Sequence, residues 1–157
     1  MTLRHLDLFS GTKSWTRAFE KIGFECVSVD LDKKTSPTHI ADMLTWDYTM
    51  YPPGYFHAIT AGPPCTEYSR ARTTGPPRNL ELADRLVAKT LEIINYFRPL
   101  SWCIENPQTG LLKTRDVVAG VLYNDVSYCR YCPSDGSFPP YRKLTRIWSN
   151  FRRRLDS

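Results

Sequence analysis

The sequence lacks both a long apolar run and an export signal. None of its hydrophobic stretches approaches the ~18 residues that a membrane-spanning helix needs, although hydrophobic residues make up 41% of the chain. Its first residues, MTLRHLDLFSG, do not show the basic and then apolar order of a secretion signal. These absences argue against a membrane protein and favour an intracellular protein in a reducing compartment.

Cysteine is too sparse and too irregular for a disulfide framework. The five cysteines are an odd number scattered along the chain: Cys26, Cys65, Cys103, Cys129 and Cys132. The last two form a Cys-x-x-Cys pair, but a structural zinc site needs four ligands and no second such pair stands nearby. The histidines are isolated and flank predicted strands. We therefore predict no metal site and at least one working thiol.

Repeats and linkers are absent as well. A chain of 157 residues is long enough for one ordinary domain, so we expect a single domain over residues 1–157. The net charge of +5 is concentrated near the end, in YRKLTRIWSNFRRRLDS at 141–157. This basic stretch indicates an anionic partner such as DNA, and the alternative is a solvated basic tail.

The hydrophobic pattern alternates between strand and helix spacing. Short apolar stretches predict strands at 3–9, 25–30, 56–62 and 101–106, with a weaker one at 39–43. Helical spacing from Trp15 to Ile22 predicts a helix with Thr12 as a possible cap and Gly23 as its stop. A longer helix is predicted from Leu82 to Phe97, between Asn79 and Pro99. Strands that alternate with helices predict an α/β fold, with a parallel sheet covered by helices on both faces.

Polar clusters follow three of the predicted strands: Ser10-Gly11, Pro64-Cys65 and Glu105-Asn106. Because the carboxyl ends of parallel strands meet at one edge of a sheet, these clusters are expected around a single crevice. The crevice would then hold a thiol, a carboxyl group and a glycine turn.

The thiol and the carboxyl group each have a functional and a structural interpretation. Cys65 would be a nucleophile if nearby positive charge, such as that of Arg70 and Arg72, stabilised its thiolate. Otherwise it is a small, half-buried hydrophobic residue. Glu105 would donate a proton if its pKa were raised at the mouth of the sheet, and otherwise it is a surface carboxylate.

Together these residues resemble the cytosine-5 DNA methyltransferase family. The matching stretches, in the family's order, are DLFSG (7–11), VDLD (29–32), GPPCTEYS (62–69) and ENP (105–107), with a weaker match in YRKLTRIW (141–148). The resemblance implies a Rossmann-like class I methyltransferase fold. It also implies transfer of a methyl group from S-adenosylmethionine to carbon 5 of cytosine in DNA.

The resemblance assigns a role to each residue of the crevice. It implies that Cys65 adds to ring carbon 6 of cytosine, while Glu105 meets ring nitrogen 3 as an acid. It implies cofactor binding by Phe9, Gly11, Asp30, Leu31, Asp42, Met43 and Pro63. It implies substrate binding by Pro64, Ser69, Asn106, Pro107, Lys143 and Arg146. Taken singly, Asp30 could equally cap a turn, and the basic residues could flank an ordinary strand at TRIWSN.

The chain also departs from the family pattern. SGTKSW places Lys13 and Ser14 where the family carries further glycines, so the cofactor turn is expected to be tighter or to use the Lys13 side chain. No room follows residue 150 for the family's DNA-reading region or its closing asparagine motif. Three alternatives therefore stay open: a weak or inactive relative that binds nucleic acid or cofactor, the same chemistry on a cytosine nucleotide or RNA, and DNA recognition supplied by a partner or second copy.

Overall fold

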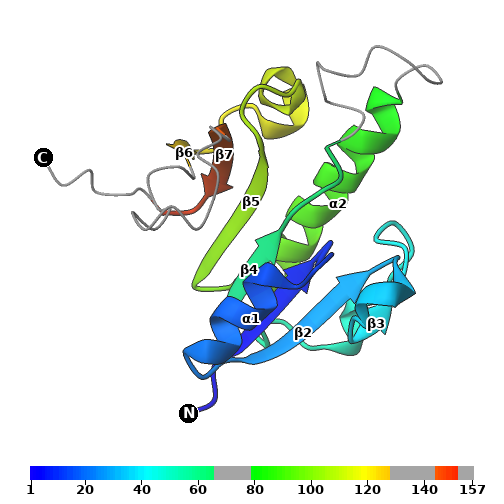
Figure 1. The fold of residues 1–157 in the computed structure, drawn as a ribbon, viewed down its shortest axis with the longest axis vertical. Helices are drawn as coiled ribbons and strands as arrows, with labels where there is room; N and C mark the ends of the chain where they lie inside the picture. Colours follow the sequence, from blue (N-terminus) through cyan, green and yellow to red (C-terminus); the bar gives the residue numbers. More distant parts are fainter. Residues whose placement is uncertain (66–78, 128–143, 152–157) are drawn as a thin grey trace, which may run out of the picture.

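A seven-stranded, mostly parallel sheet forms the centre of the structure, which is a computed structural model (Figure 1). The structure describes residues 1–65, 79–127 and 144–151. The strand order is β3-β2-β1-β4-β5-β7-β6, and β7 runs antiparallel to both of its neighbours. The strands are β1 Arg4–Leu8, β2 Glu25–Asp30, β3 His39–Ile40, β4 Ala58–Ala61, β5 Ser101–Pro107, β6 Tyr123–Ser127 and β7 Leu144–Ser149.

The predicted α/β architecture is confirmed. Strands appear at each expected position, and the weak segment at 39–43 contributes the two-residue strand β3. Two α-helices, α1 Ser14–Lys21 and α2 Leu80–Phe97, lie on opposite faces of the sheet (Figure 1). The sequence does not predict β6, because YNDVS lacks the apolar run of the other strands. Short 3₁₀ turns at Leu112–Thr114 and Asp116–Val118 connect β5 to β6.

The hydrophobic core lies between the sheet and α2. Leu6 and Leu8 alternate along β1 with polar residues, and both are fully buried. They pack with apolar residues of the neighbouring strands and with the buried side of α2, namely Ile59, Ile104, Ala83, Val87, Ile93, Ile94 and Phe97. Burying each large side chain contributes about 1.5–3 kcal/mol, so this face of the sheet dominates the stability.

The long helix begins and ends where the sequence predicts. The Asn79 side-chain oxygen accepts a hydrogen bond from the Leu82 amide at 3.0 Å, which caps α2. At the other end, Arg98 takes a left-handed conformation with φ 50° and Pro99 follows. In the described ranges, neither α1 nor α2 is both long and apolar enough to cross a bilayer.

The short helix α1 is capped by a strand residue instead of a neighbour in sequence. The Asp7 carboxylate, on β1, accepts hydrogen bonds from the Thr16 amide at 3.2 Å and the Thr16 hydroxyl at 2.7 Å. Lys13 occupies the N-cap position without a side-chain bond, so the prediction that Thr12 caps the helix is wrong. The buried Asp7 carboxylate can cap α1 from β1 because it reaches an amide in the first turn of the helix, as a local cap would.

Asp7 belongs to a buried polar network between the sheet and α1. Thr60 joins it to His5, whose Nε2 lies 2.8 Å from the Thr60 hydroxyl. His5 also stacks on Phe19 of α1 at 3.9 Å between ring centroids. Burial lowers the pKa of His5 from 6.5 to about 4. Burial also raises the pKa of Asp7 from 3.8 to about 6, although the bonds from Thr16 oppose that rise and the nearby Asp30 adds to it.

These two shifts predict opposite dependences of stability on pH between about 4 and 6. Unfolded His5 binds a proton that folded His5 lacks, so its contribution to stability grows as the pH rises. Folded Asp7 keeps a proton that the unfolded residue loses, so its contribution falls as the pH rises. Asp7→Asn should therefore make the free energy of unfolding rise more steeply with pH, by up to about 1.4 kcal/mol per pH unit.

Urea unfolding at pH 4, 5 and 6 checks this prediction. Asn can still accept from the Thr16 amide and donate to the Thr60 hydroxyl, so the variant should keep its fold. His5→Gln should change the slope in the opposite direction. Parallel curves for wild type and both variants would contradict the assignment of the two shifts.

Candidate active site

The turn after β1 brings the backbone close to the end of β2. Phe9 and Gly11 both have left-handed φ angles, 55° and 48°, and this conformation is costly for a residue other than glycine. The Ser10 amide donates to the Val29 carbonyl oxygen at 3.1 Å, which holds the strained turn against β2. The turn is therefore set by its contacts with the neighbouring strand.

Asp30, the last residue of β2, receives two backbone amides. Its Oδ2 accepts from the Gly11 amide and its Oδ1 from the Asp32 amide, both at 2.8 Å. The carboxylate thus caps two turns, as one of the alternatives from the sequence expects. Each oxygen has a second lone pair, so hydrogen bonds from ligand hydroxyls remain available.

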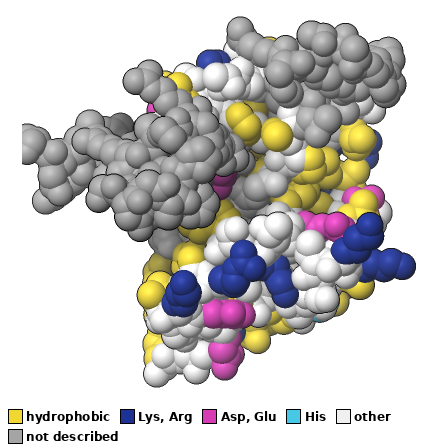
Figure 2. Space-filling model, in the orientation of Figure 1, with side chains coloured by type: hydrophobic (Ala, Val, Ile, Leu, Met, Phe, Trp, Pro, Cys, Tyr) yellow, Lys and Arg dark blue, Asp and Glu magenta, His cyan; other side chains and the backbone are white. Residues whose placement is uncertain are grey.

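A cavity of about 460 Å³ opens beside these turns. Its walls come from the ends of β1, β2, β3 and β4 and from the first turns of α2. In this region Figure 2 shows hydrophobic side chains together with acidic ones. The lining residues are Phe9, Gly11, Asp30, Leu31, Ala41, Asp42, Met43, Leu44, Gly62, Pro64, Leu82 and Leu86.

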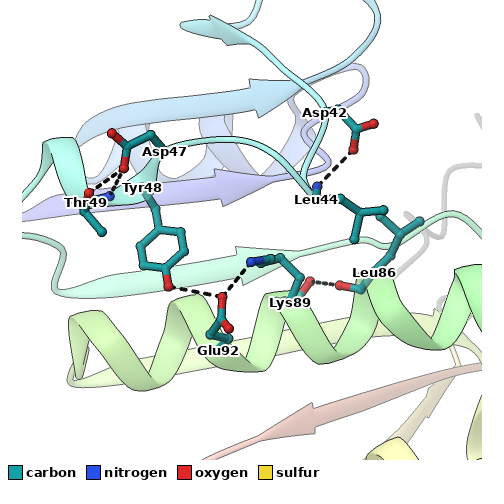
Figure 3. Close-up of polar contacts among 9 residues, drawn as sticks. Asp42, Leu44, Asp47, Tyr48, Thr49, Leu86, Lys89 and Glu92 are labelled. Atoms are coloured by element: carbon teal, nitrogen blue, oxygen red, sulfur yellow. Dashed lines mark hydrogen bonds and ion pairs between the residues drawn. The ribbon is translucent and has the colours of Figure 1, made fainter.

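Asp42 and α2 face each other across this cavity. Asp42 Oδ1 accepts from the Leu44 amide at 2.9 Å, which fixes the carboxylate at the start of a turn. Figure 3 shows the Leu86 side chain pointing from α2 toward the segment that carries Asp42 and Leu44. Below it, Tyr48 and Lys89 both donate to Glu92, which ties that segment to the helix.

The cavity suits a nucleoside that bears an amino group. Its apolar walls, including Phe9 and Leu86, offer contact to a flat ring. Asp30 can accept from ribose hydroxyls and Asp42 from an exocyclic amine. The residues present therefore fit the adenosine portion of S-adenosylmethionine.

The segment after β4 carries the candidate nucleophile. The Gly62 amide donates to the Leu8 carbonyl oxygen at 3.2 Å, and the chain then leaves the sheet through two prolines. The buried Asn106 side chain donates from Nδ2 to the Pro63 carbonyl oxygen at 3.2 Å. Cys65 lies two residues beyond this anchor and is exposed, with a free thiol.

Glu105 lies on the neighbouring strand at the same edge of the sheet. In the parallel pairing of β4 and β5, Ala61 lies opposite Ile104, so Glu105 follows beside the start of the Cys65 segment. Glu105 is half-buried. The structure therefore brings the strand ends that carry Cys65 and Glu105 together, and the Asn106–Pro63 bond joins them.

The other described thiols are poor nucleophiles. Burial, with the charge of Glu105 in addition, raises the pKa of Cys103 to about 12, and burial raises that of Cys26 to about 11. A thiol reacts as its thiolate, so both stay protonated at neutral pH. Among the described cysteines, Cys65 is the exposed one and so the candidate for covalent chemistry.

The two prolines have different surroundings. Pro64, expected to bind substrate, lines the cavity, whereas Pro63, expected to bind cofactor, is buried and accepts a hydrogen bond from Asn106 through its carbonyl oxygen. The six other predicted cofactor residues line the cavity: Phe9, Gly11, Asp30, Leu31, Asp42 and Met43. Ser69, Lys143, Arg70 and Arg72 lie outside the described residues.

Arg146 lies away from Glu105. It pairs with Asp125 through two hydrogen bonds, of 2.7 and 2.8 Å, and its guanidinium lies 3.7 Å from the centre of the Tyr123 ring. Asp125 holds the pKa of Arg146 above its usual range. In the pairing of β5 with β7, Arg146 lies opposite Asn106, so its side chain points to the sheet face opposite to that of Glu105.

Lys13 stands in the turn where the family pattern carries a glycine. Its φ is 61°, a left-handed value, and its ammonium group donates to the Ser36 carbonyl oxygen at 3.0 Å. Lys13 does not line the cavity. The side chain thus ties the turn to the segment after β2.

Sequence reasoning missed several of the cavity residues. Leu82 and Leu86 were predicted only as the apolar face of a helix, and Ala41, Leu44 and Gly62 were not singled out. In the structure Leu82 is 38% exposed although it sits on that apolar face, and the hydrophobic pattern of the sequence does not show this exposure. An apolar side chain that the core leaves exposed near a predicted crevice indicates a ligand wall.

No cluster of three or more His, Cys, Asp or Glu side chains suited to a metal occurs in residues 1–65, 79–127 and 144–151. The histidines there have other partners. His39 contacts the Tyr51 hydroxyl at 2.8 Å, and His57 accepts from the Arg4 amide at 2.9 Å. Cys129 and Cys132 fall outside the described ranges.

Comparisons with known sequences identify the relatives of this chain. The family model described as C-5 cytosine-specific DNA methylase matches residues 3–126. A protein of Frog virus 3 (isolate Goorha), named "Probable DNA (cytosine-5)-methyltransferase", is 35% identical over 161 aligned residues, which cover 94% of this chain and 71% of that protein.

Solved structures share the fold. A protein of Escherichia coli described as a DNA modification methyltransferase encoded within a prophage superposes with a TM-score of 0.64 at 18% identity, covering 94% of this chain. The Dnmt2 methyltransferase of S. pombe gives a TM-score of 0.58 at 16% identity, covering 97% of this chain. This chain spans 46% and 52% of their lengths, about half in each case.

The cavity wall predicts a change in cofactor affinity. Leu86→Ala removes apolar contact worth about 1.5 kcal/mol, so the dissociation constant for S-adenosylmethionine should rise roughly tenfold. Titration calorimetry measures this constant. Leu91→Ala is the matched control, because Leu91 also packs on the core from α2 but does not line the cavity. Equal affinities for the two variants would contradict the assignment of the cavity.

The bond between Asn106 and Pro63 predicts a defect in both stability and reactivity. Asn106→Ala leaves the Pro63 carbonyl oxygen without its donor, which should cost about 1–3 kcal/mol in urea unfolding. It should also slow formation of the expected adduct between Cys65 and cytosine, because the segment that carries Cys65 loses its hydrogen bond to β5. Asn150→Ala is the control, since Asn150 bridges Leu100 and Trp102 at the opposite end of β5. A similar loss of reactivity in both variants would count against a local role for Asn106.

Proposed function

The chain belongs to the C-5 cytosine-specific DNA methylase family, and we propose that it methylates carbon 5 of cytosine in DNA through a covalent adduct on Cys65. The methyl donor of this family is S-adenosylmethionine. The observation that carries the proposal is the junction of the two strand ends. There an exposed thiol follows β4, a half-buried carboxyl group lies near the end of β5, and the Asn106–Pro63 bond joins the two segments.

Cytosine needs activation because its carbon 5 is a weak nucleophile. The Cys65 thiolate adds to ring carbon 6, and its electron pair forms the new carbon–sulfur bond. The ring then carries electron density at carbon 5, which would form a bond to the methyl carbon of the bound donor while the methyl–sulfur bond breaks and leaves its electron pair on the departing thioether. Loss of the carbon 5 proton to a base and expulsion of the Cys65 thiolate restore the aromatic ring and release the product.

Glu105 handles the charge that this addition creates. Attack at carbon 6 pushes negative charge toward ring nitrogen 3, and a protonated carboxyl group at that edge donates to it. The same hydrogen bond distinguishes cytosine from thymine, whose nitrogen 3 carries a proton. In a duplex the base must also leave the stack, at a cost of a few kcal/mol.

The cavity residues hold the cofactor in this proposal. Asp30 accepts from the ribose hydroxyls, Asp42 accepts from the adenine amino group, and Phe9 packs against the ring. Leu82 and Leu86 close the apolar side from α2. When bound, S-adenosylmethionine supplies an electrophilic methyl group on a sulfonium centre.

We propose further that the protein acts inside the cell. We also propose that the basic end of the chain binds the phosphate backbone of DNA. The stretch 141–157 is rich in Lys and Arg, and phosphate contacts of this kind weaken steeply as salt rises. Figure 2 shows further Lys and Arg side chains in a band across the lower part of the described surface, with Asp and Glu side chains beside them. Sequence recognition would then come from a partner or a second copy.

Trapping on DNA that contains 5-fluorocytosine tests the proposal. Fluorine cannot leave as a proton does, so wild-type protein with S-adenosylmethionine should accumulate a covalent complex that denaturing electrophoresis resolves. Cys65→Ser should form none. Glu105→Gln should form it about a hundredfold more slowly or worse, because the acid is lost. Cys26→Ser is the matched thiol control and should behave as wild type.

The outcomes separate the competing functions. Wild-type protein that binds cofactor yet forms no adduct with any cytosine substrate would overturn the catalytic proposal and favour a binding protein. An adduct with RNA or a cytosine nucleotide, but none with duplex or single-stranded DNA, would keep the chemistry and change the substrate. An adduct in Cys65→Ser would remove Cys65 as the nucleophile.

A further inference from the structure

The hydroxyl group of Thr145 is buried and, among the described residues, has no hydrogen-bond partner. Thr145 lies on β7 and is 0% exposed, and its Oγ1 forms no hydrogen bond within residues 1–65, 79–127 and 144–151. Such a group costs about 1–3 kcal/mol, which a valine of the same shape would avoid. An unpaired hydroxyl at this position therefore points to a partner in another state of the site.

The strand register places this hydroxyl beside the candidate acid. In the antiparallel pairing of β5 with β7, Pro107 lies opposite Thr145 and Glu105 lies opposite Ile147. Residues that are directly opposed share a face, so Thr145 and Glu105 are diagonal neighbours on one side of the sheet. Diagonal neighbours lie about 7–8 Å apart, within reach of a long side chain such as glutamate.

Two polar neighbours of Thr145, Arg146 and Asn106, lie on the sheet face opposite to that of Glu105. Arg146 points to the opposite face, where Asp125 and Tyr123 hold its guanidinium. Asn106 shares that opposite face, since it pairs with Arg146 across the strands. On β7, then, the residue placed to act on Glu105 is the threonine and not the arginine beside it.

We propose that Thr145 is a positioning residue for Glu105. When cytosine is bound, the Thr145 hydroxyl donates to one carboxyl oxygen of Glu105. This bond fixes the side chain so that its other, protonated oxygen meets ring nitrogen 3. The inference rests on the proposed function, because it assigns Thr145 a role in that reaction.

A hydrogen bond of this kind has a signature in the pH dependence of the reaction. Donation to a carboxyl group favours its ionised form and lowers its pKa. The alkaline limb of the kcat profile should therefore move upward in a variant that lacks the hydroxyl, an effect that a purely structural role would not produce.

Thr145→Val tests the proposal, because valine keeps the shape and removes the hydroxyl. Its melting temperature and its affinity for S-adenosylmethionine should match or exceed those of wild type. Its kcat for methyl transfer to DNA should fall roughly ten- to hundredfold, the equivalent of one lost hydrogen bond. KM for DNA should stay within about twofold. Thr145→Ser should restore kcat and the pH limb.

Ser149→Ala is the matched control on the same strand and face. Its hydroxyl is also buried, but it donates to the Phe151 carbonyl oxygen at 2.8 Å. Its loss should lower the melting temperature and leave the pH limb in place. The inference would be overturned if Thr145→Val kept the wild-type kcat and the wild-type alkaline limb. It would also be overturned if Thr145→Val had a lower melting temperature than wild type and Thr145→Ser did not restore it. Failure of the wild-type protein itself to form an adduct would instead overturn the proposed function.

Discussion

The hydrogen bond from the Asn106 amide to the Pro63 carbonyl oxygen holds the two halves of the candidate active site together. Pro63 and Pro64 have no backbone N–H, so the segment that carries Cys65 cannot continue the ladder of β4. Carbonyl oxygens are what remain to hold its backbone, and Asn106 reaches one of them from β5. β4 and β5, which contribute Ile59, Ala61 and Ile104 to the hydrophobic core, thereby also position the segments that carry the candidate reacting groups.

Beside the cavity, carboxylates hold neighbouring segments together as Asn106 does near Cys65. Asp30 gathers the amides of Gly11 and Asp32, and Asp7 replaces a local cap for α1. Asp30 joins β2 to the turn after β1, and Asp7 joins β1 to α1, so the strained turn at Phe9 is held at both of its ends. This explains how Lys13 can occupy a left-handed position that glycine would adopt more cheaply.

The features predicted from the sequence are those that depend on local patterns. Alternating periods located β1, β2, β4, β5 and both helices, and parallel pairing then required one shared edge. Features that depend on long-range pairing were not accessible. The register of β7 decides that Arg146 turns away from Glu105, and nothing in YRKLTRIW encodes that register. The Asp7 cap of α1 was missed for the same reason, because its donor and acceptor lie on different elements.

The exposure of Cys65 leaves its thiol open to oxidation. An accessible thiol that can reach a base can also be reached by peroxide, which converts it to sulfenic acid. Cys103 is buried and Cys26 is half-buried, and the raised pKa of each thiol keeps it protonated and so less reactive. Oxidative damage among these three sulfurs would fall first on Cys65, the one that the proposed chemistry needs, and it would stop that chemistry while leaving the fold intact.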